Sequence, residues 1–184
     1  MANNFWSNAQ VSPKLSYRWV VAGMGGGSHA IPIYSLIAFQ KPSLEVHVSE
    51  YININDVAYK PGMLTWNPIE IVLIDAEIPE GNTTAQVYKM MGTAGYSKRE
   101  GKPMSAIIKS KGSQALGGQI IFQQIYADNP KQPDAKATST LESWTLVKPF
   151  ITKVDYGRAT YATEEVMTVN LTIRYDDARY QLKK

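Results

Sequence analysis

The feature of this sequence that most constrains its fold is a period-two alternation of apolar and polar residues, which recurs along most of the chain. The clearest case is the segment 167–175, MTVNLTIRY, whose odd-numbered residues are apolar or aromatic and whose even-numbered residues are polar. Successive side chains of a β-strand point to opposite faces, so this segment is predicted to be a strand with one apolar face. Such one-sided strands favour antiparallel pairing around a shared core.

The same alternation occurs in the segments 15–21, 44–54 and 119–123, and we expect their apolar faces to pack inside the subunit. The segment 69–74 is apolar except at Glu70, which indicates a central strand that is covered on both faces. Pro149 interrupts an apolar stretch and predicts a bulge or an edge strand, because proline cannot donate to a sheet ladder.

One short helix is predicted, over residues 84–91. Residues 82–84 (Asn, Thr, Thr) can each accept a hydrogen bond from a free amide at the helix start, and Gln86 has the spacing of a capping box. The glycines at 92 and 95 are expected to end it. Its apolar stripe, which we expect to lie against the sheet, comprises Val87, Met90 and Met91.

The 184 residues fit a single domain, 1–184, with an N-terminal arm (1–14), a β-sandwich core (15–180) and a long loop (128–139). Clusters of glycine, proline and small polar residues predict further loops at 23–28, 59–62 and 97–103.

Composition excludes several classes of protein. A hydrophobic content of 44% with 19% charged residues is typical of a soluble globular chain, and the net charge of +3 is too small for the basic stripe of a nucleic-acid binder. The longest apolar stretch, 30–39, is far short of the roughly 20 residues of a spanning helix, so no membrane segment is expected.

No motif predicts catalysis. There is no cysteine and there are two histidines, which leaves no multi-histidine metal site. The glycine cluster 23–28 lacks the lysine of a phosphate loop, and no hydrolase signature is present. Asp176 and Asp177 are neighbours that would point to opposite faces of a strand. We therefore expect no enzyme, no cofactor and no metal.

Two sections of the chain carry a distinctive order of motifs. The middle section has KPSLEV (41–46), KPGMLTWNPIEI (60–71) and Asp75, and the C-terminal section has ESWTL (142–146) and IRYDDA (173–178). From about Leu15 to Tyr180 this order resembles the tail tube proteins of contractile-tailed bacteriophages, a family related in fold to the inner-tube proteins of contractile injection and type VI secretion systems.

The resemblance implies a mainly β fold, an antiparallel β-sandwich or half-barrel with one short helix, which completes a β-barrel in a hexameric ring. Stacked rings would form a hollow conduit for DNA ejection into the host, located in the tail of the virion and assembled in the host cytoplasm. It implies as partners other copies of the chain, the tail sheath, the baseplate or tube initiator, the tail terminator, the tape measure protein and, in transit, double-stranded DNA.

Contacts between subunits and rings are expected from the arm and from the loop 56–66, where apolar residues occur in a turn-like stretch. Charge reversal at Lys60 or removal of the arm is expected to abolish assembly without unfolding the subunit. The alternative is that Met63 and Leu64 cover their own core. The candidate contact residues are Phe5, Trp6, Val57, Tyr59, Lys60, Met63 and Leu64.

Two other functions stay open. One is a tube-initiator or baseplate ring, or the inner tube of a non-phage contractile injection system, for which the segments 23–28 and 128–139 would be specialised insertions. The other is a β-barrel module for single-stranded nucleic acid, since the chain has four tryptophans and eleven tyrosines. The aromatic residues are not interleaved with a lysine or arginine stripe, which favours core and interface packing instead.

Overall fold

The computed structural model describes residues 14, 16–24, 31, 35–77, 82–96, 109–125, 140–161 and 165–182. Phe5, Trp6 and the predicted loops 97–103 and 128–139 lie outside these ranges. The elements in chain order are β1 (Trp19–Ala22), β2 (Leu36–Phe39), β3 (Leu44–Ile52), β4 (Val57–Trp66), β5 (Ile69–Ile74), α1 (Thr83–Ala94), α2 (Lys109–Ala115), β6 (Gln119–Ile125), β7 (Thr140–Val147), β8 (Phe150–Asp155), β9 (Thr168–Arg174) and β10 (Asp177–Leu182).

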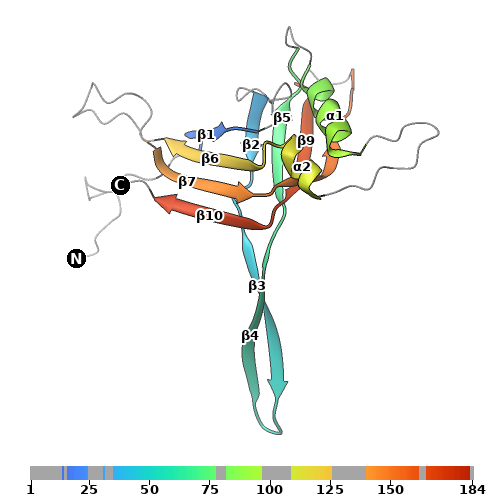
Figure 1. Cartoon of the computed structure of the whole chain (residues 1–184). Helices are drawn as coiled ribbons and strands as arrows, with labels where there is room; N and C mark the ends of the chain where they lie inside the picture. The colour runs from blue at the N-terminus through green and yellow to red at the C-terminus, as the bar shows by residue number, and fades with distance from the viewer. Residues whose placement is uncertain are drawn as a thin grey trace, which may run out of the picture.

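Eight of these strands form two four-stranded antiparallel sheets that pack face to face. Sheet A has the order β1-β6-β7-β10 and sheet B the order β2-β5-β9-β8. Their strands cross one another, and the remaining pair, β3 and β4, projects from this body (Figure 1). The predicted mainly β fold with antiparallel sheets is confirmed.

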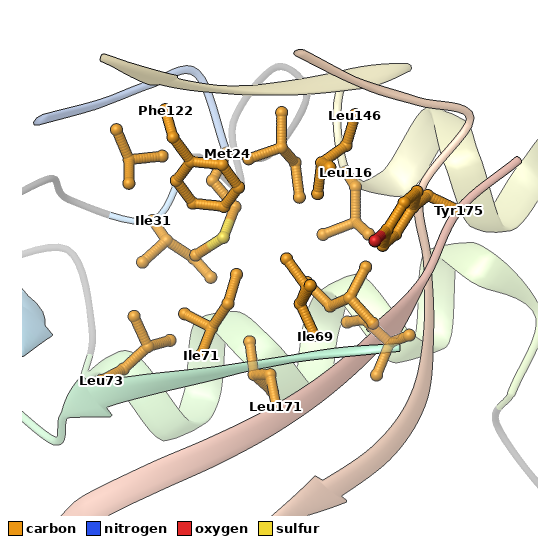
Figure 2. Close-up of a cluster of buried hydrophobic side chains, with 14 of the residues drawn as sticks. Met24, Ile31, Ile69, Ile71, Leu73, Leu116, Phe122, Leu146, Leu171 and Tyr175 are labelled. Carbon is orange, nitrogen blue, oxygen red and sulfur yellow. The ribbon is translucent and has the colours of Figure 1, made fainter. Parts of the chain in front are cut away.

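The core lies between the two sheets and draws on both (Figure 2). The alternation at 167–175 is confirmed, because Val169, Leu171 and Ile173 of β9 are buried. The strand β5 lies between β2 and β9, as expected for a central strand. Only one of its faces is fully buried, however, since Glu70 on the other face is exposed. The largest fully buried side chains include Ile69, Ile71, Leu73, Met90, Leu116, Ile120, Phe122 and Leu146.

The chain passes from sheet A to sheet B in a tight connection at Lys148 and Pro149. Lys148 has a φ of 51°, in the left-handed region, and β8 begins immediately after the proline. The strand β8 is an edge of sheet B, as Pro149 predicted.

The predicted helix is α1, which is longer than the expected 84–91. Asn82 caps its start, because its Oδ1 accepts a hydrogen bond from the Ala85 amide at 2.7 Å. Gly95 ends it with a φ of 94°, whereas Gly92 lies inside the helix. A second helix, α2, was not predicted from its sequence, KSKGSQA, which is short, carries a glycine in its middle and has no apolar stripe at helical spacing. It packs its buried Gly112 close to Phe150 of β8.

Three boundary predictions were wrong. The strand expected from residue 15 begins at Trp19, and the strand expected to reach residue 54 ends at Ile52. The loop expected at 59–62 lies inside β4, where a bulge accommodates Pro61 and Gly62.

Candidate assembly surfaces

The β3–β4 hairpin is a continuation of the β2–β5 pair of sheet B. Two backbone hydrogen bonds bridge the joint: the Gln40 amide donates to the Glu70 carbonyl at 2.9 Å, and the Asn67 amide donates to the Ser43 carbonyl at 2.9 Å. Trp66 anchors the hairpin to the core, with its ring centroid 6.0 Å from that of Tyr175. A single two-stranded ribbon therefore runs from the body into solvent.

The register of the hairpin separates its side chains into two faces, because residues directly opposite in an antiparallel ladder share a face. A bulge in β4 places Gly62 and Met63 opposite His47 and so preserves this separation. Gly62 fits there because a Cβ would lie 3.0 Å from the His47 carbonyl oxygen. The apolar hairpin face comprises Leu44, Val46, Val48, Glu50, Ile52, Val57, Tyr59, Pro61, Leu64 and Trp66.

The apolar hairpin face is exposed for most of its length. Val48 is 58% exposed, Tyr59 is 68% exposed and Ile52 is 74% exposed. The expectation that the alternation at 44–54 packs inside the subunit was therefore wrong. An isolated two-stranded hairpin is at best marginally stable in water, and a contiguous exposed apolar patch marks an interaction surface.

The described contact candidates divide between the two faces of the hairpin. Val57, Tyr59 and Leu64 lie on the apolar hairpin face, whereas Lys60 and Met63 lie on the opposite, more polar face. Met63 and Leu64 do not cover the core of their own subunit, because both are exposed. The contact roles of these residues stay predictions.

Sequence reasoning missed half of the apolar hairpin face, the half that belongs to β3. Its apolar residues are Leu44, Val46, Val48 and Ile52, and its fifth member is Glu50. The available signal was the polar stretch 53–56, Asn-Ile-Asn-Asp, between two β-rich segments, which is typical of a hairpin turn.

Each sheet of the body has two edge strands, β1 and β10 in sheet A and β2 and β8 in sheet B. Within each sheet neighbouring strands are antiparallel, so with four strands the two edges run in opposite directions. A second copy can therefore continue either sheet without breaking the antiparallel alternation.

The face of sheet A that points away from the core is nearly neutral. Its charged residues on the described strands are Asp177 and Arg179, which form an ion pair of 3.6 Å. The register places amide and hydroxyl side chains around this pair, namely Gln119, Gln123, Ser143, Thr145 and Gln181.

Glu142 of β7 is a buried carboxylate at one end of sheet A. It bonds to Lys14, accepts a hydrogen bond from Lys41 Nζ at 3.3 Å, and accepts one from the Tyr180 hydroxyl at 3.1 Å. Burial alone would raise the pKa of Glu142, but the hydrogen bonds from Lys14, Tyr180 and Lys41 outweigh it and hold that pKa below its ordinary value. The cluster therefore ties Lys41, at the base of the hairpin, to sheet A.

Within the ranges given above, no three histidine, aspartate or glutamate side chains gather in a way that could hold a metal ion. No helix in the same part of the chain is long and apolar enough to cross a membrane.

No protein-family model matches the chain, and no curated protein matches it in sequence. Solved structures match it in fold. One match is to a chain of the anti-feeding prophage (AFP) baseplate, 6-fold symmetrised, with a TM-score of 0.61 at 13% identity. The aligned region covers 94% of this chain and 97% of the baseplate chain. The AFP tube terminating cap has a TM-score of 0.61 at 16% identity and covers both chains completely.

A chain of the PVC sheath-tube complex, an extracellular contractile injection system in the extended state, has a TM-score of 0.56 at 16% identity. It covers 99% of this chain and 100% of its own. The protein thus has the fold of subunits found in the baseplate, the cap and the sheath-tube complex of contractile injection systems.

Proposed function

We propose that this protein is a structural subunit of the tube of a contractile injection machine or phage tail and is not an enzyme. Six copies close into a ring, and stacked rings form a hollow conduit. The observation that carries the proposal is the apolar hairpin face, which is exposed beside a body whose described core residues are packed between its two sheets. The fold likeness to chains of tube, cap and baseplate assemblies supports it.

Ring closure uses the edges of the sheets. Edge strands present unpaired amide and carbonyl groups, and a closed ring pairs them without leaving an open end. The edges of each sheet run in opposite directions, so each copy continues the sheet of its neighbour.

Ring stacking uses the hairpin. β4 has ten residues, which span about 30 Å, a length that carries the apolar hairpin face from one ring body to the next. The neutral outer face of sheet A suits a conduit wall, because a wall without net charge does not hold a polyanion by its phosphates. DNA passage, contacts with sheath, baseplate, terminator and tape measure protein, and location in a virion tail belong to this proposal.

A second candidate is a ring that caps or initiates a tube. The chains of the AFP cap and the AFP baseplate, each with a TM-score of 0.61, favour it over the sheath-tube chain with its TM-score of 0.56. The length of the assembly separates a cap from a tube subunit, since a cap stops at one ring.

The test compares two neighbouring substitutions on opposite faces of the hairpin, Val48→Asp and Ser49→Asp, by negative-stain electron microscopy and size-exclusion chromatography. Wild-type protein and Ser49→Asp are expected to form hollow tubes, whereas Val48→Asp is expected to stay monomeric with unchanged unfolding. Tubes of Val48→Asp as abundant as the wild-type tubes would remove the hairpin from the interface. A wild-type monomer that binds single-stranded oligonucleotides in a salt-sensitive way would overturn the conduit altogether.

A further inference from the structure

A cleft of about 680 Å³ lies between the edge strands β1 and β2. Its walls are aromatic and aliphatic: the Trp19 and Phe39 rings meet edge to face at 5.4 Å, and Ile37 is exposed beside them. Lys14 and Lys41 stand at its rim, each about half exposed. The cleft therefore suits an apolar group that is accompanied by negative charge.

The cleft also holds an unused hydrogen-bond acceptor. Gln124 lines it and is 2% exposed, and among the described residues its Oε1 has no hydrogen-bond partner. An unpaired buried acceptor destabilises the protein, so a ligand that brings an N–H group would remove that cost. Glu142, the neighbour of Gln124 across the ladder, is already engaged by Lys14, Lys41 and Tyr180.

The tip of the β3–β4 hairpin, residues 50–57, has the matching chemistry. Ile54 is fully exposed at the turn, and asparagines on both sides of it supply amide donors. Glu50 and Asp56 give the tip two negative charges. Around the cleft, the three positive charges of Lys14, Lys41 and Arg18 exceed the one negative charge of Glu142 by two, so the charges of the tip and the cleft balance.

The tip cannot reach the cleft of its own chain, because the hairpin extends away from the body that contains β1 and β2 (Figure 1). We propose that the hairpin tip of one copy binds in the β1–β2 cleft of a second copy, with Ile54 packed against the wall that Trp19 and Ile37 form and an amide of the tip donating to Gln124. The proposal rests on the proposed function and names the surface that receives the hairpin.

Cysteine cross-linking tests the pairing directly, because the chain has no cysteine of its own. In the double variant Asn55→Cys with Ile37→Cys, which keeps Ile54 and Asn53, tip and cleft can form a disulfide only if they meet. Mild oxidation of assembled protein is expected to give a ladder of covalent multimers. The matched control, Asn55→Cys with Tyr88→Cys, places the second thiol on an exposed position of α1 and is expected to give no ladder.

Electron microscopy of the same samples shows whether tubes form, so the conduit and the cleft pairing are tested separately. Tubes without a ladder would overturn the cleft pairing and leave the conduit standing. A ladder with no tubes would support the pairing and count against the conduit. Neither a ladder nor tubes at any concentration would overturn both.

The N-terminal segment of the same chain is the rival occupant of the cleft. We expect a maleimide to label the introduced thiol of the single variant Ile37→Cys rapidly in the monomer and slowly in tubes. Protection of that thiol in the monomer would assign the cleft to the chain's own N-terminal segment and overturn the pairing.

Discussion

The sandwich body and the β3–β4 hairpin carry the same kinds of apolar residue in the same alternating pattern, but their surroundings are opposite. Leu73 of β5 is fully buried, whereas Leu64, on the same continuous ribbon, is 51% exposed. Alternation determines which face of a strand is apolar, but it does not determine what covers that face. In the body the second sheet covers it, and in the hairpin a second copy of the chain is proposed to do so.

The largest effect is expected from a matched pair of leucine truncations. Leu73→Ala should lower the free energy of unfolding by about 2–5 kcal/mol, because it empties space in a packed core. Leu64→Ala removes the same atoms from an exposed position and should change it by about 0.5 kcal/mol or less. Urea unfolding of the monomer measures both, and equal losses would show that the hairpin is part of the folding core.

Two glycines extend the comparison to the backbone. Gly157, beside β8, has a φ of 76°, and a Cβ there would lie 2.6 Å from the Thr168 carbonyl oxygen. Gly157→Ala should therefore destabilise the body by about 1–3 kcal/mol. Gly62→Ala, in the hairpin bulge, should cost less, about 1 kcal/mol, because a Cβ there would lie 3.0 Å from the His47 carbonyl oxygen and Gly62 has no positive φ. Thermal unfolding ranks the two variants. A larger loss of stability for Gly62→Ala than for Gly157→Ala would show that the body depends on the hairpin for its stability.

A substitution at Glu142 tests the connection between the body and the hairpin, because Glu142 accepts a hydrogen bond from Lys41 at the base of the hairpin. Its folded pKa is depressed, so its stabilising contribution is present above the unfolded value of about 4.3 and is lost as the pH falls through the folded pKa. Because both lysines are half exposed, Glu142→Gln should cost about 1 kcal/mol or less near pH 7.

Urea unfolding of wild type and Glu142→Gln at about pH 7 and about pH 3 checks this sign. The difference between the two proteins should shrink in acid. A difference that stays constant over this range would show that the carboxylate charge contributes nothing to the joint.

The smallest effect is expected at Tyr175, which packs against Trp66 where the hairpin leaves the body. Its hydroxyl is buried without a partner among the described residues, and burial raises the pKa of Tyr175 to about 12. Tyr175→Phe should change the stability near pH 7 by about 0.5 kcal/mol or less.

In alkali the two proteins should separate. An unfolded tyrosine ionises near pH 10, so wild type loses stability as the pH rises above about 10 and Tyr175→Phe is spared that loss. Parallel stability curves for the two proteins up to about pH 11 would show that the Tyr175 hydroxyl reaches water.

Much of the fold could be predicted from local patterns. The alternating residues of β9 predicted which of its faces is buried. Asn82 and Gly95, both expected at the ends of the helix, are the N-cap and C-cap residues of α1. The helix α2 could not be predicted, because its seven residues have no apolar stripe at helical spacing and its central glycine fits against Phe150 only in the folded protein. The segment 59–62 was read as a loop because proline and glycine usually end strands, and a bulge overrides that rule here.

The candidate site was predicted only on one strand. Val57, Tyr59 and Leu64 were found as apolar residues in a turn-like stretch, but their partners on β3 looked like core because alternation is the same in both settings. The cleft joins residues from β1, β2 and β6, and no pattern within one segment indicates such a meeting.

The continuity of the hairpin with β5 also decides how the molecule carries force. β5 lies between β2 and β9, and ladder hydrogen bonds run across the strands. Because β3 follows β2 and β4 precedes β5, a pull on the hairpin moves β2 and β5 together. The load therefore falls lengthwise, in shear, on the ladder between β5 and β9, where all of its hydrogen bonds resist at once.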